Sequence, residues 1–233
     1  MSRTCSLLAI AFLAGACLRA DPLSCLPGNF ASYEALGATG CTVGPFIVKD
    51  FFFGVLSGSG SVTDTTIFVT PTNSAPDVWG LNFGSGGFLV AGSESVRYLV
   101  AYTWDPTEDI LSIDDVMDPP FAVPPGLASV TTDACLNAAF SGAVCPTSAV
   151  SINVFQDGIS PQLFASVTFA PVPVVGIRHT IDLQANGGSA GFDSLSNEVR
   201  IVPEPAMGLT CFGILILIVL AARLTPVRSR LHF

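Results

Sequence analysis

Hydrophobic and polar side chains alternate along residues 95–104. Large apolar or aromatic residues occupy every second position: Val96, Tyr98, Val100, Tyr102 and Trp104. Successive side chains of a strand point to opposite faces, so this spacing predicts a β-strand with one buried face. Further runs rich in Val, Ile, Thr and Phe are expected to be strands over residues 46–53, 62–70, 109–117, 149–156, 162–170, 174–184 and 192–201.

Turn-forming residues separate these runs. They are Gly58-Ser59-Gly60, Pro119-Pro120, Pro124-Pro125-Gly126, Asp157-Gly158 and Asn186-Gly187-Gly188. About nine short strands with turns roughly every 8–12 residues predict an all-β fold, an antiparallel β-sandwich. Residues 29–36 are expected to form one short helix. In Phe51-Phe52-Phe53, Phe52 must face away from its neighbours, and we expect it to pack under a loop or an edge rather than lie exposed to a partner.

The N-terminus has the pattern of an export signal. Arg3 precedes an apolar run at 7–13 that is too short to span a bilayer, and small residues follow it. Cleavage after Ala20 makes residues 1–20 a signal peptide. Two alternatives are cleavage at Ala14-Gly15-Ala16 and a lipoprotein cut before Cys17.

The C-terminus has its own three-part pattern. Residues 206–222 carry no charge, and Arg223, Arg228 and Arg230 follow. A helix of this length spans about 26 Å, which nearly matches a hydrocarbon core of roughly 30 Å. We therefore expect a transmembrane helix in the inner membrane, with the basic tail cytoplasmic and the rest of the chain outside. A buried strand at 214–220 is the alternative.

Pro203-Glu204-Pro205 stands just ahead of this apolar span. With the span and the basic tail, residues 203–233 resemble the PEP-CTERM sorting signal of exported bacterial proteins. The resemblance implies an exosortase as the processing enzyme, removal of the tail, and a location at the cell surface or in the extracellular matrix. It also implies an association with extracellular polysaccharide and biofilm.

The central region, residues 21–202, loosely resembles a set of all-β PEP-CTERM proteins. The similarity lies in Tyr33, the run Leu36 to Gly44, the strand ending Ile67 to Pro71, and the stretch from Cys135 to Cys145. This resemblance implies an architecture and no reaction.

Charge narrows the partners further. The chain has 233 residues, 50% of them hydrophobic, and a formal net charge of −9. The central region holds four of the basic residues and seventeen of the acidic ones. Such a surface repels phosphate, so nucleic acid is excluded as a partner, whereas a neutral glycan or a cation is acceptable.

Cys25, Cys41, Cys135 and Cys145 remain after processing. An even number in an exported protein predicts two disulfides. Three pairings exist, and proximity favours Cys25 with Cys41 and Cys135 with Cys145. Each loop would stabilise the fold by about 3 kcal/mol. Seven Cys with only two His argue against a zinc cluster.

An acidic run follows the alternating strand. Asp105, Glu108 and Asp109 form a candidate calcium loop, although the spacing is not that of an EF-hand. A solvated hairpin that also includes Asp114, Asp115 and Asp118 is the favoured interpretation, with Leu111 and Ile113 on a strand and Ser112 and Asp114 outside it.

Other candidate chemistry is sparse. His179 is the only histidine of the central region, no Gly-x-Ser-x-Gly elbow precedes it, and we expect a partly exposed structural residue. Gly84 to Gly87 is expected to be a hairpin turn rather than a phosphate loop. Trp79, Tyr98, Tyr102 and Trp104 could stack on sugars, but the last three share a strand face that favours core burial.

These observations lead to an exported, exosortase-sorted surface or matrix protein without catalysis and without a cofactor. The first alternative is a carbohydrate-binding module, with calcium assistance at the acidic run. The second is a secreted glycoside hydrolase built on two carboxylates that the sequence does not identify.

Overall fold

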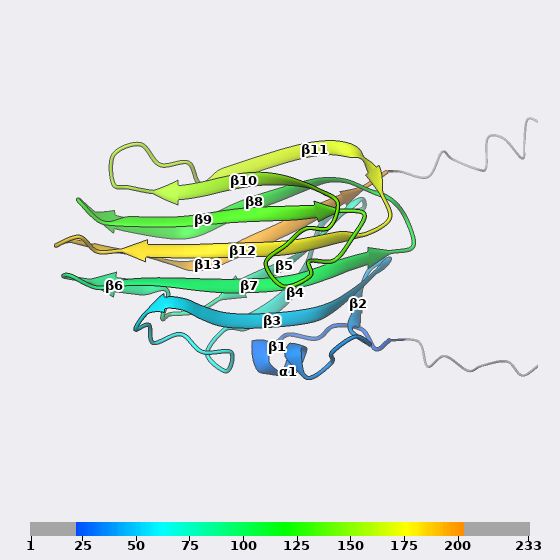
Figure 1. Ribbon diagram of the computed structural model, residues 1–233, viewed down its shortest axis with the longest axis horizontal. Helices are drawn as coiled ribbons and strands as arrows, with labels where there is room; N and C mark the ends of the chain where they lie inside the picture. The colour runs from blue at the N-terminus through cyan, green and yellow to red at the C-terminus, as the bar shows by residue number, and fades with distance from the viewer. Residues whose placement is uncertain (1–21, 203–233) are drawn as a thin grey trace, which may run out of the picture.

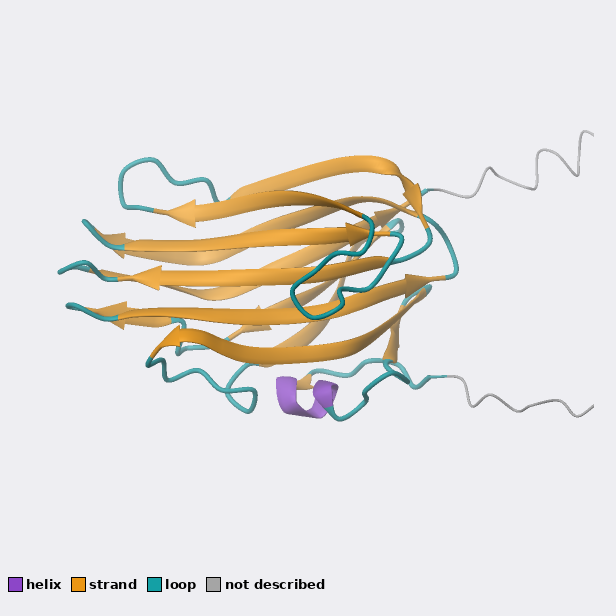
Figure 2. Cartoon of the chain, viewed as in Figure 1, coloured by secondary structure: helices purple, strands orange, loops and turns teal. Residues whose placement is uncertain are grey.

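The computed structural model describes residues 22–202, which form two antiparallel β-sheets packed face to face (Figures 1 and 2). The predicted all-β architecture is confirmed, with thirteen strands where about nine were expected. The predicted signal peptide, sorting motif, membrane helix and basic tail lie outside the described residues. Within residues 22–202, no helix has the length and apolar character needed to cross a membrane.

The six-stranded sheet lies in front in Figure 1. Its strands, in order across the sheet, are β10 (Ser148–Gln156), β9 (Leu127–Leu136), β12 (Val175–Gln184), β7 (Ser95–Pro106), β3 (Phe46–Gly58) and β2 (Cys41–Val43).

The seven-stranded sheet lies behind it. Its strands, in order, are β1 (Gly28–Asn29), β4 (Phe68–Ala75), β5 (Val78–Gly84), β13 (Ser189–Ile201), β8 (Ile110–Val123) and β11 (Phe164–Val172), with β6 (Leu89–Ala91) also paired to β13. Helix α1 (Phe30–Glu34) begins at Asn29, whose side chain accepts a hydrogen bond from the Ser32 amide, as an N-cap should. This helix lies within the predicted range 29–36.

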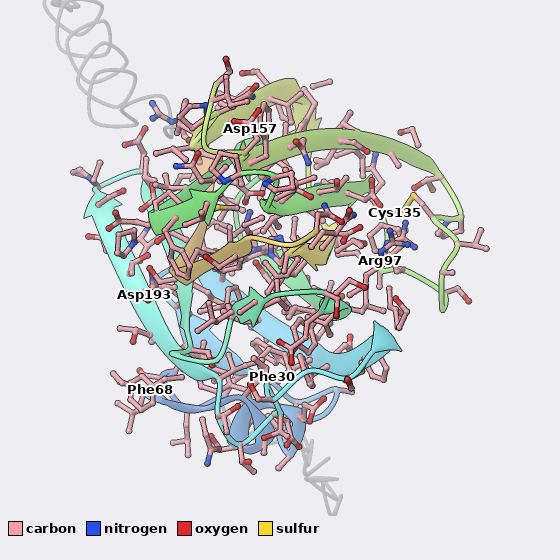
Figure 3. All side chains as sticks on the ribbon, turned by 90° about the vertical axis from the view of Figure 1, so that its left-hand side faces the viewer. Phe30, Phe68, Arg97, Cys135, Asp157 and Asp193 are labelled. Carbon is pink, nitrogen blue, oxygen red and sulfur yellow. A yellow bond between two sulfur atoms is a disulfide. The ribbon has the colours of Figure 1, made fainter. Side chains whose placement is uncertain are left out.

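The core fills the space between the two sheets. Tyr98, Tyr102 and Trp104 of β7 are buried in it, as the alternation predicts. Phe46 packs edge-on against Trp104, and Phe51 stacks on Tyr102. The end-on view places Phe68 on the outer side of one sheet, and Arg97 and Cys135 on the side of the other (Figure 3). Each sheet therefore has one face packed in the core and one face turned outward.

Two strands differ from their expected positions. The run at 62–70 becomes strand only from Phe68, because Thr63 and Thr66 hydrogen-bond to each other in a turn. Strand β9 was not predicted at all. Its inward positions are Ala128, Val130, Thr132 and Ala134, too small and polar to give a hydrophobic period.

The turn at Gly84 to Gly87 is not a hairpin. A hairpin turn joins two strands that pair with each other. Here β5 and β6 pair with successive stretches of β13 instead, and residues 84–87 connect them along the same side of that strand.

The acidic hairpin is also corrected by the structure. Ile113, Asp115 and Met117 of β8 point into the core, and Asp115 is fully buried rather than solvated. Ser112 lies on the outer side with Asp114, as expected, but its neighbours cover it and leave it only 6% exposed. Asp114 remains half-buried on the outer side, where it accepts a hydrogen bond from Ser166.

Candidate functional site

The outer face of the six-stranded sheet carries one continuous row of side chains across four strands. Asp133 of β9 pairs with Arg178 of β12, Arg178 with Ala101 of β7, and Ala101 with Phe52 of β3. Adjacent strands lie about 4.8 Å apart, so Arg178 and Phe52 stand roughly 10 Å from each other with only the Ala101 methyl between them. Ala101 therefore forms the floor of a depression, with larger side chains on either side of it.

One wall is Phe52, whose side chain is 52% exposed. The expectation that it packs under a loop or an edge is therefore wrong. A bulge between Lys49 and Phe52, with Asp50 at a φ of 58°, shifts the strand by one residue. The shift turns Phe51 and Phe53 toward the core and leaves Phe52 and the exposed Asp50 carboxylate outside.

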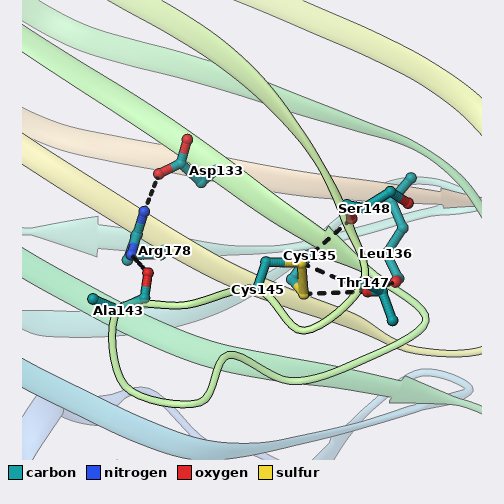
Figure 4. Close-up of a disulfide and its surroundings, with 8 residues drawn as sticks. All are labelled: Asp133, Cys135, Leu136, Ala143, Cys145, Thr147, Ser148 and Arg178. Atoms are coloured by element: carbon teal, nitrogen blue, oxygen red, sulfur yellow. Dashed lines mark hydrogen bonds and ion pairs between the residues drawn. A yellow bond between two sulfur atoms is a disulfide. The ribbon is translucent and has the colours of Figure 1, made fainter.

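The opposite wall is the β9–β10 loop, residues 137–147, which folds back over the sheet (Figure 4). The Cys135–Cys145 disulfide closes the loop across a Cα–Cα distance of 5.4 Å. The Gly176 amide donates to the Ala138 carbonyl at 3.0 Å. A Cβ on Gly176 would lie 2.9 Å from that oxygen, so the loop can approach β12 this closely only over a glycine.

Arg178 of β12 holds this loop against the sheet. Its guanidinium donates to the Asp133 carboxylate at 2.6 Å and to the Ala143 carbonyl at 2.5 Å (Figure 4). It also lies over the Phe140 ring, with 4.7 Å from Cζ to the ring centroid. One side chain thus positions both the loop backbone and an aromatic ring opposite Phe52.

These walls enclose a groove of about 470 Å³, a volume within the range of small-molecule sites. Most of its lining is apolar, and Asp50 and Arg178 are its charged side chains. The lining residues are Asp50, Phe52, Leu99, Ala101, Tyr102, Thr103, Ala139, Phe140, Gly142, Ile177 and Arg178. We refer to this site as the outer-face groove.

A second, more open depression of about 420 Å³ lies at an edge of the sandwich and includes Trp79. Trp79 is half-buried, and its ring packs on Gly44, where an added Cβ would lie 2.5 Å from it. Of the four aromatic residues considered for sugar stacking, Tyr98, Tyr102 and Trp104 are inaccessible in the core. The aromatic rings that the sequence did not single out for sugar contact, Phe52 and Phe140, line the outer-face groove instead.

His179 is fully buried, in contrast to the expected partial exposure. Its Nδ1 lies 2.6 Å from the Thr132 hydroxyl and its Nε2 lies 3.0 Å from the Tyr102 hydroxyl. Burial lowers the pKa of His179 to about 3, against a smaller opposite effect of Asp133. The imidazole is sealed from solvent, so it is not in a position to act on a substrate as a general base.

In the candidate calcium loop, one of the three proposed ligands is already paired with a basic side chain. Asp105 forms an ion pair with Lys49 across β7 and β3. In the part of the chain that the structure describes, no three His, Cys, Asp or Glu side chains are grouped so as to hold a metal ion. Calcium binding at Asp105, Glu108 and Asp109 stays a prediction.

Both disulfides have the pairing that sequence proximity favours. Cys25 joins Cys41 with a Cα–Cα distance of 4.9 Å, and Cys135 joins Cys145. The first ties the segment before α1 to β2, and the second forms the base of the loop that walls the groove. The residues of the sorting motif, Pro203, Glu204 and Pro205, and the tail residues Arg223, Arg228 and Arg230 lie outside the described residues.

No protein-family model matches the chain, and no curated protein matches it. Among solved structures, it is similar to TmCBM61 in complex with β-1,4-galactotriose, with 12% identity over 72% of this chain and 97% of that chain and a TM-score of 0.30. It is also similar to the mannan-recognising carbohydrate-binding module TmCBM27, with 14% identity over 76% and 96% of the two chains and a TM-score of 0.27.

A third similar structure is the enzymatically active domain of tailspike protein 4 from bacteriophage CBA120. It is 8% identical over 69% of this chain and 20% of that chain, with a TM-score of 0.28. All three TM-scores are low, so these similarities carry no argument about function.

Proposed function

We propose that this protein is an exported, non-catalytic surface or matrix protein that holds extracellular polysaccharide in the outer-face groove. The observation that carries the proposal is Phe52, a large aromatic side chain left 52% exposed in a concave site. Exposed apolar side chains are common singly, but here a second aromatic ring, Phe140, stands on the facing wall.

The composition of the groove suits a sugar ring. One face of a pyranose presents C–H groups, which pack on an aromatic ring, while its hydroxyls need hydrogen-bonding partners around the edge. Phe52 and Phe140 supply the rings, and the Asp50 carboxylate and the Arg178 guanidinium supply an acceptor and donors. The small floor residue Ala101 leaves room for the ring between the walls.

The charge of the molecule favours neutral or cationic glycans over anionic ones. Seventeen acidic and four basic residues lie in the region 21–202, and Arg178 is already paired with Asp133. The signal peptide expected at residues 1–20 would export this region, and an exosortase would recognise the sorting signal expected at residues 203–233 and remove the tail. Export and glycan binding together describe a protein that attaches to matrix polysaccharide without cleaving it.

The test is affinity electrophoresis of the exported protein through gels containing neutral polysaccharides, galactans and mannans among them. Phe52→Ala is expected to weaken retention at least tenfold, because the aromatic platform is lost. Phe68→Ala is the matched control, since Phe68 is also 52% exposed but lies on the other sheet.

Equal retention of both variants would show that the groove is not the binding site. Absence of retention on every polysaccharide, with the protein still found in the matrix, would leave a purely structural role. Release of shorter oligosaccharides would instead support the hydrolase alternative.

A further inference from the structure

Five polar side chains form a closed hydrogen-bonded ring in the core, directly behind the outer-face groove. Three come from the six-stranded sheet and two from the seven-stranded sheet, and each is at most 2% exposed. In order around the ring they are Asp115, Thr132, His179, Tyr102 and Asn197. The ring is a polar connection between the two sheets.

The contacts are short. The Thr132 hydroxyl bonds to Asp115 Oδ2 and lies 2.6 Å from His179 Nδ1. The His179 Nε2 lies 3.0 Å from the Tyr102 hydroxyl, and that hydroxyl donates to Asn197 Oδ1 at 2.6 Å. The Asn197 amide donates to Asp115 Oδ1 at 2.8 Å and closes the ring.

Counting hydrogens shows what this ring requires. Five contacts need five hydrogens, one in each. The hydroxyls of Thr132 and Tyr102 supply one each, the Asn197 amide directs one into the ring, and a neutral His179 supplies one. Four groups therefore fill four contacts, and the count is the same whichever way around the ring the donors point. The fifth hydrogen must be an acidic proton on either Asp115 or His179.

We propose that the folded core holds this one proton on Asp115, as a carboxylic acid that donates to the Thr132 hydroxyl, with His179 neutral and protonated on Nε2. Thr132 then donates to Nδ1 of His179, and Nε2–H donates to Tyr102. The other arrangement, a carboxylate with an imidazolium, would bury two charges separated by a hydroxyl, which desolvation disfavours.

The electrostatic surroundings agree with this assignment. Burial raises the pKa of Asp115 to about 6, and the neighbouring Asp114 adds to the increase. Burial lowers the pKa of His179 to about 3, although Asp133 of β9 opposes the decrease. Glu198 of β13 accepts a hydrogen bond from Ser74 outside the core. The rings in contact with His179 and Tyr102 are Phe51, Phe83 and Trp104, which carry no charge.

The ring makes a specific prediction for the dependence of stability on pH. In the unfolded chain, Asp115 and His179 titrate at their ordinary values of 3.8 and 6.5, so the pair holds one proton between them. The folded ring also holds one proton, between about pH 3 and pH 6. Both states thus bind the same number of protons near pH 4–6, and the pair leaves the free energy of unfolding almost unchanged there.

In the wild type, Asp115 and His179 change the free energy of unfolding in opposite directions as the pH rises, and the two changes cancel. Substituting either residue should reveal the pH dependence that the other contributes. In Asp115→Asn, the side-chain amide supplies the fifth hydrogen permanently. The wild-type carboxyl has a raised pKa, so its stabilising contribution is lost as the pH rises through about 6, and the variant lacks this loss. The ratio of the variant's unfolding constant to that of the wild type should fall roughly thirtyfold from pH 4 to pH 6.

In His179→Gln, the opposite change is expected. The lowered pKa of His179 costs the wild type stability as the pH falls from 6.5 toward 3, and the variant lacks this cost. Its unfolding constant relative to wild type should rise roughly seventyfold from pH 4 to pH 6. Both constants are measured by urea denaturation of the full-length protein with its disulfides intact.

Nitrogen NMR of the imidazole provides a test that needs no core substitution. His232→Ala leaves His179 as the single histidine of the chain. At pH 5 its spectrum should be that of a neutral ring protonated on Nε2. An imidazolium spectrum would place the proton on His179 and overturn the assignment to Asp115. A pH-independent ratio for Asp115→Asn would overturn the proposal that the ring holds a proton, even if His179→Gln fails to fold.

Discussion

The inner face of a sandwich sheet is usually apolar and the outer face polar, but at one place the six-stranded sheet has the reverse. Behind β7, β9 and β12, the inward face carries Tyr102, Thr132 and His179 in a polar ring, whereas the outward face carries an apolar groove walled by Phe52. The inward polar groups are stable there because each has a hydrogen-bonding partner. Phe52 is 52% exposed on the outward face, as the proposed binding of a polysaccharide requires, and the polar ring connects the two sheets on the inward face.

The largest expected effect separates two adjacent phenylalanines. Phe51→Ala should lower the free energy of unfolding by about 3–5 kcal/mol, because Phe51 is buried and stacks on Tyr102. Phe52→Ala should change it by less than about 0.5 kcal/mol. Urea denaturation measures both values, and equal losses would mean that Phe52 is part of the core after all.

The next effect tests the ring itself. Thr132→Val keeps the volume but removes one hydrogen bond from each of Asp115 and His179, which keep only Asn197 and Tyr102 as partners, and we expect a loss of about 3 kcal/mol. The matched control is Thr180→Val, which removes a hydroxyl from the half-exposed outer face of the same sheet. A ring that contributes nothing would make the two variants alike.

A comparable effect is expected at the loop. Replacing Cys135 and Cys145 together with Ser should lower the free energy of unfolding by about 2–3 kcal/mol through the entropy of the opened loop. It should also weaken polysaccharide retention, since the loop is one wall of the groove. The Cys25–Cys41 pair provides the control, because its removal should affect stability and spare retention.

The smallest effect concerns Arg178. Arg178→Lys keeps the charge but cannot bond to Asp133 and the Ala143 carbonyl simultaneously with a planar fork. We expect about 1 kcal/mol of lost stability and faster amide hydrogen exchange confined to residues 137–147. Unchanged exchange in this loop would show that the disulfide alone holds it in place.

The sequence predicts those parts of this molecule that depend on neighbouring residues. Alternation identifies β7, the short spacing of the cysteines favours the correct disulfides, and Asn29 begins the helix near the expected position. Strand β9 is missed because its core side chains are small, and only its neighbours β10 and β12 make it a strand.

The candidate site is harder to predict because it depends on register between distant segments. Phe52 and Arg178 become neighbours across β7 only after a bulge shifts β3 by one residue. In the sequence, Asp115 is one of several acidic residues in a run that is expected to be solvated. Nothing nearby in the sequence indicates that it will be buried and hydrogen-bonded to Thr132 and Asn197. Buried polar groups of this kind are paired by topology, not by local pattern.

The position of the last strand has a mechanical consequence. β13 lies inside its sheet, with β8 along one side and β5 and β6 along the other (Figure 1). Consider a pull on Ile201 along the strand axis, as from the membrane helix expected before the tail is removed, while the groove holds a polymer. The hydrogen bonds of both neighbouring ladders would then be loaded together in shear, rather than opened one after another, so β13 would resist extraction along its whole length.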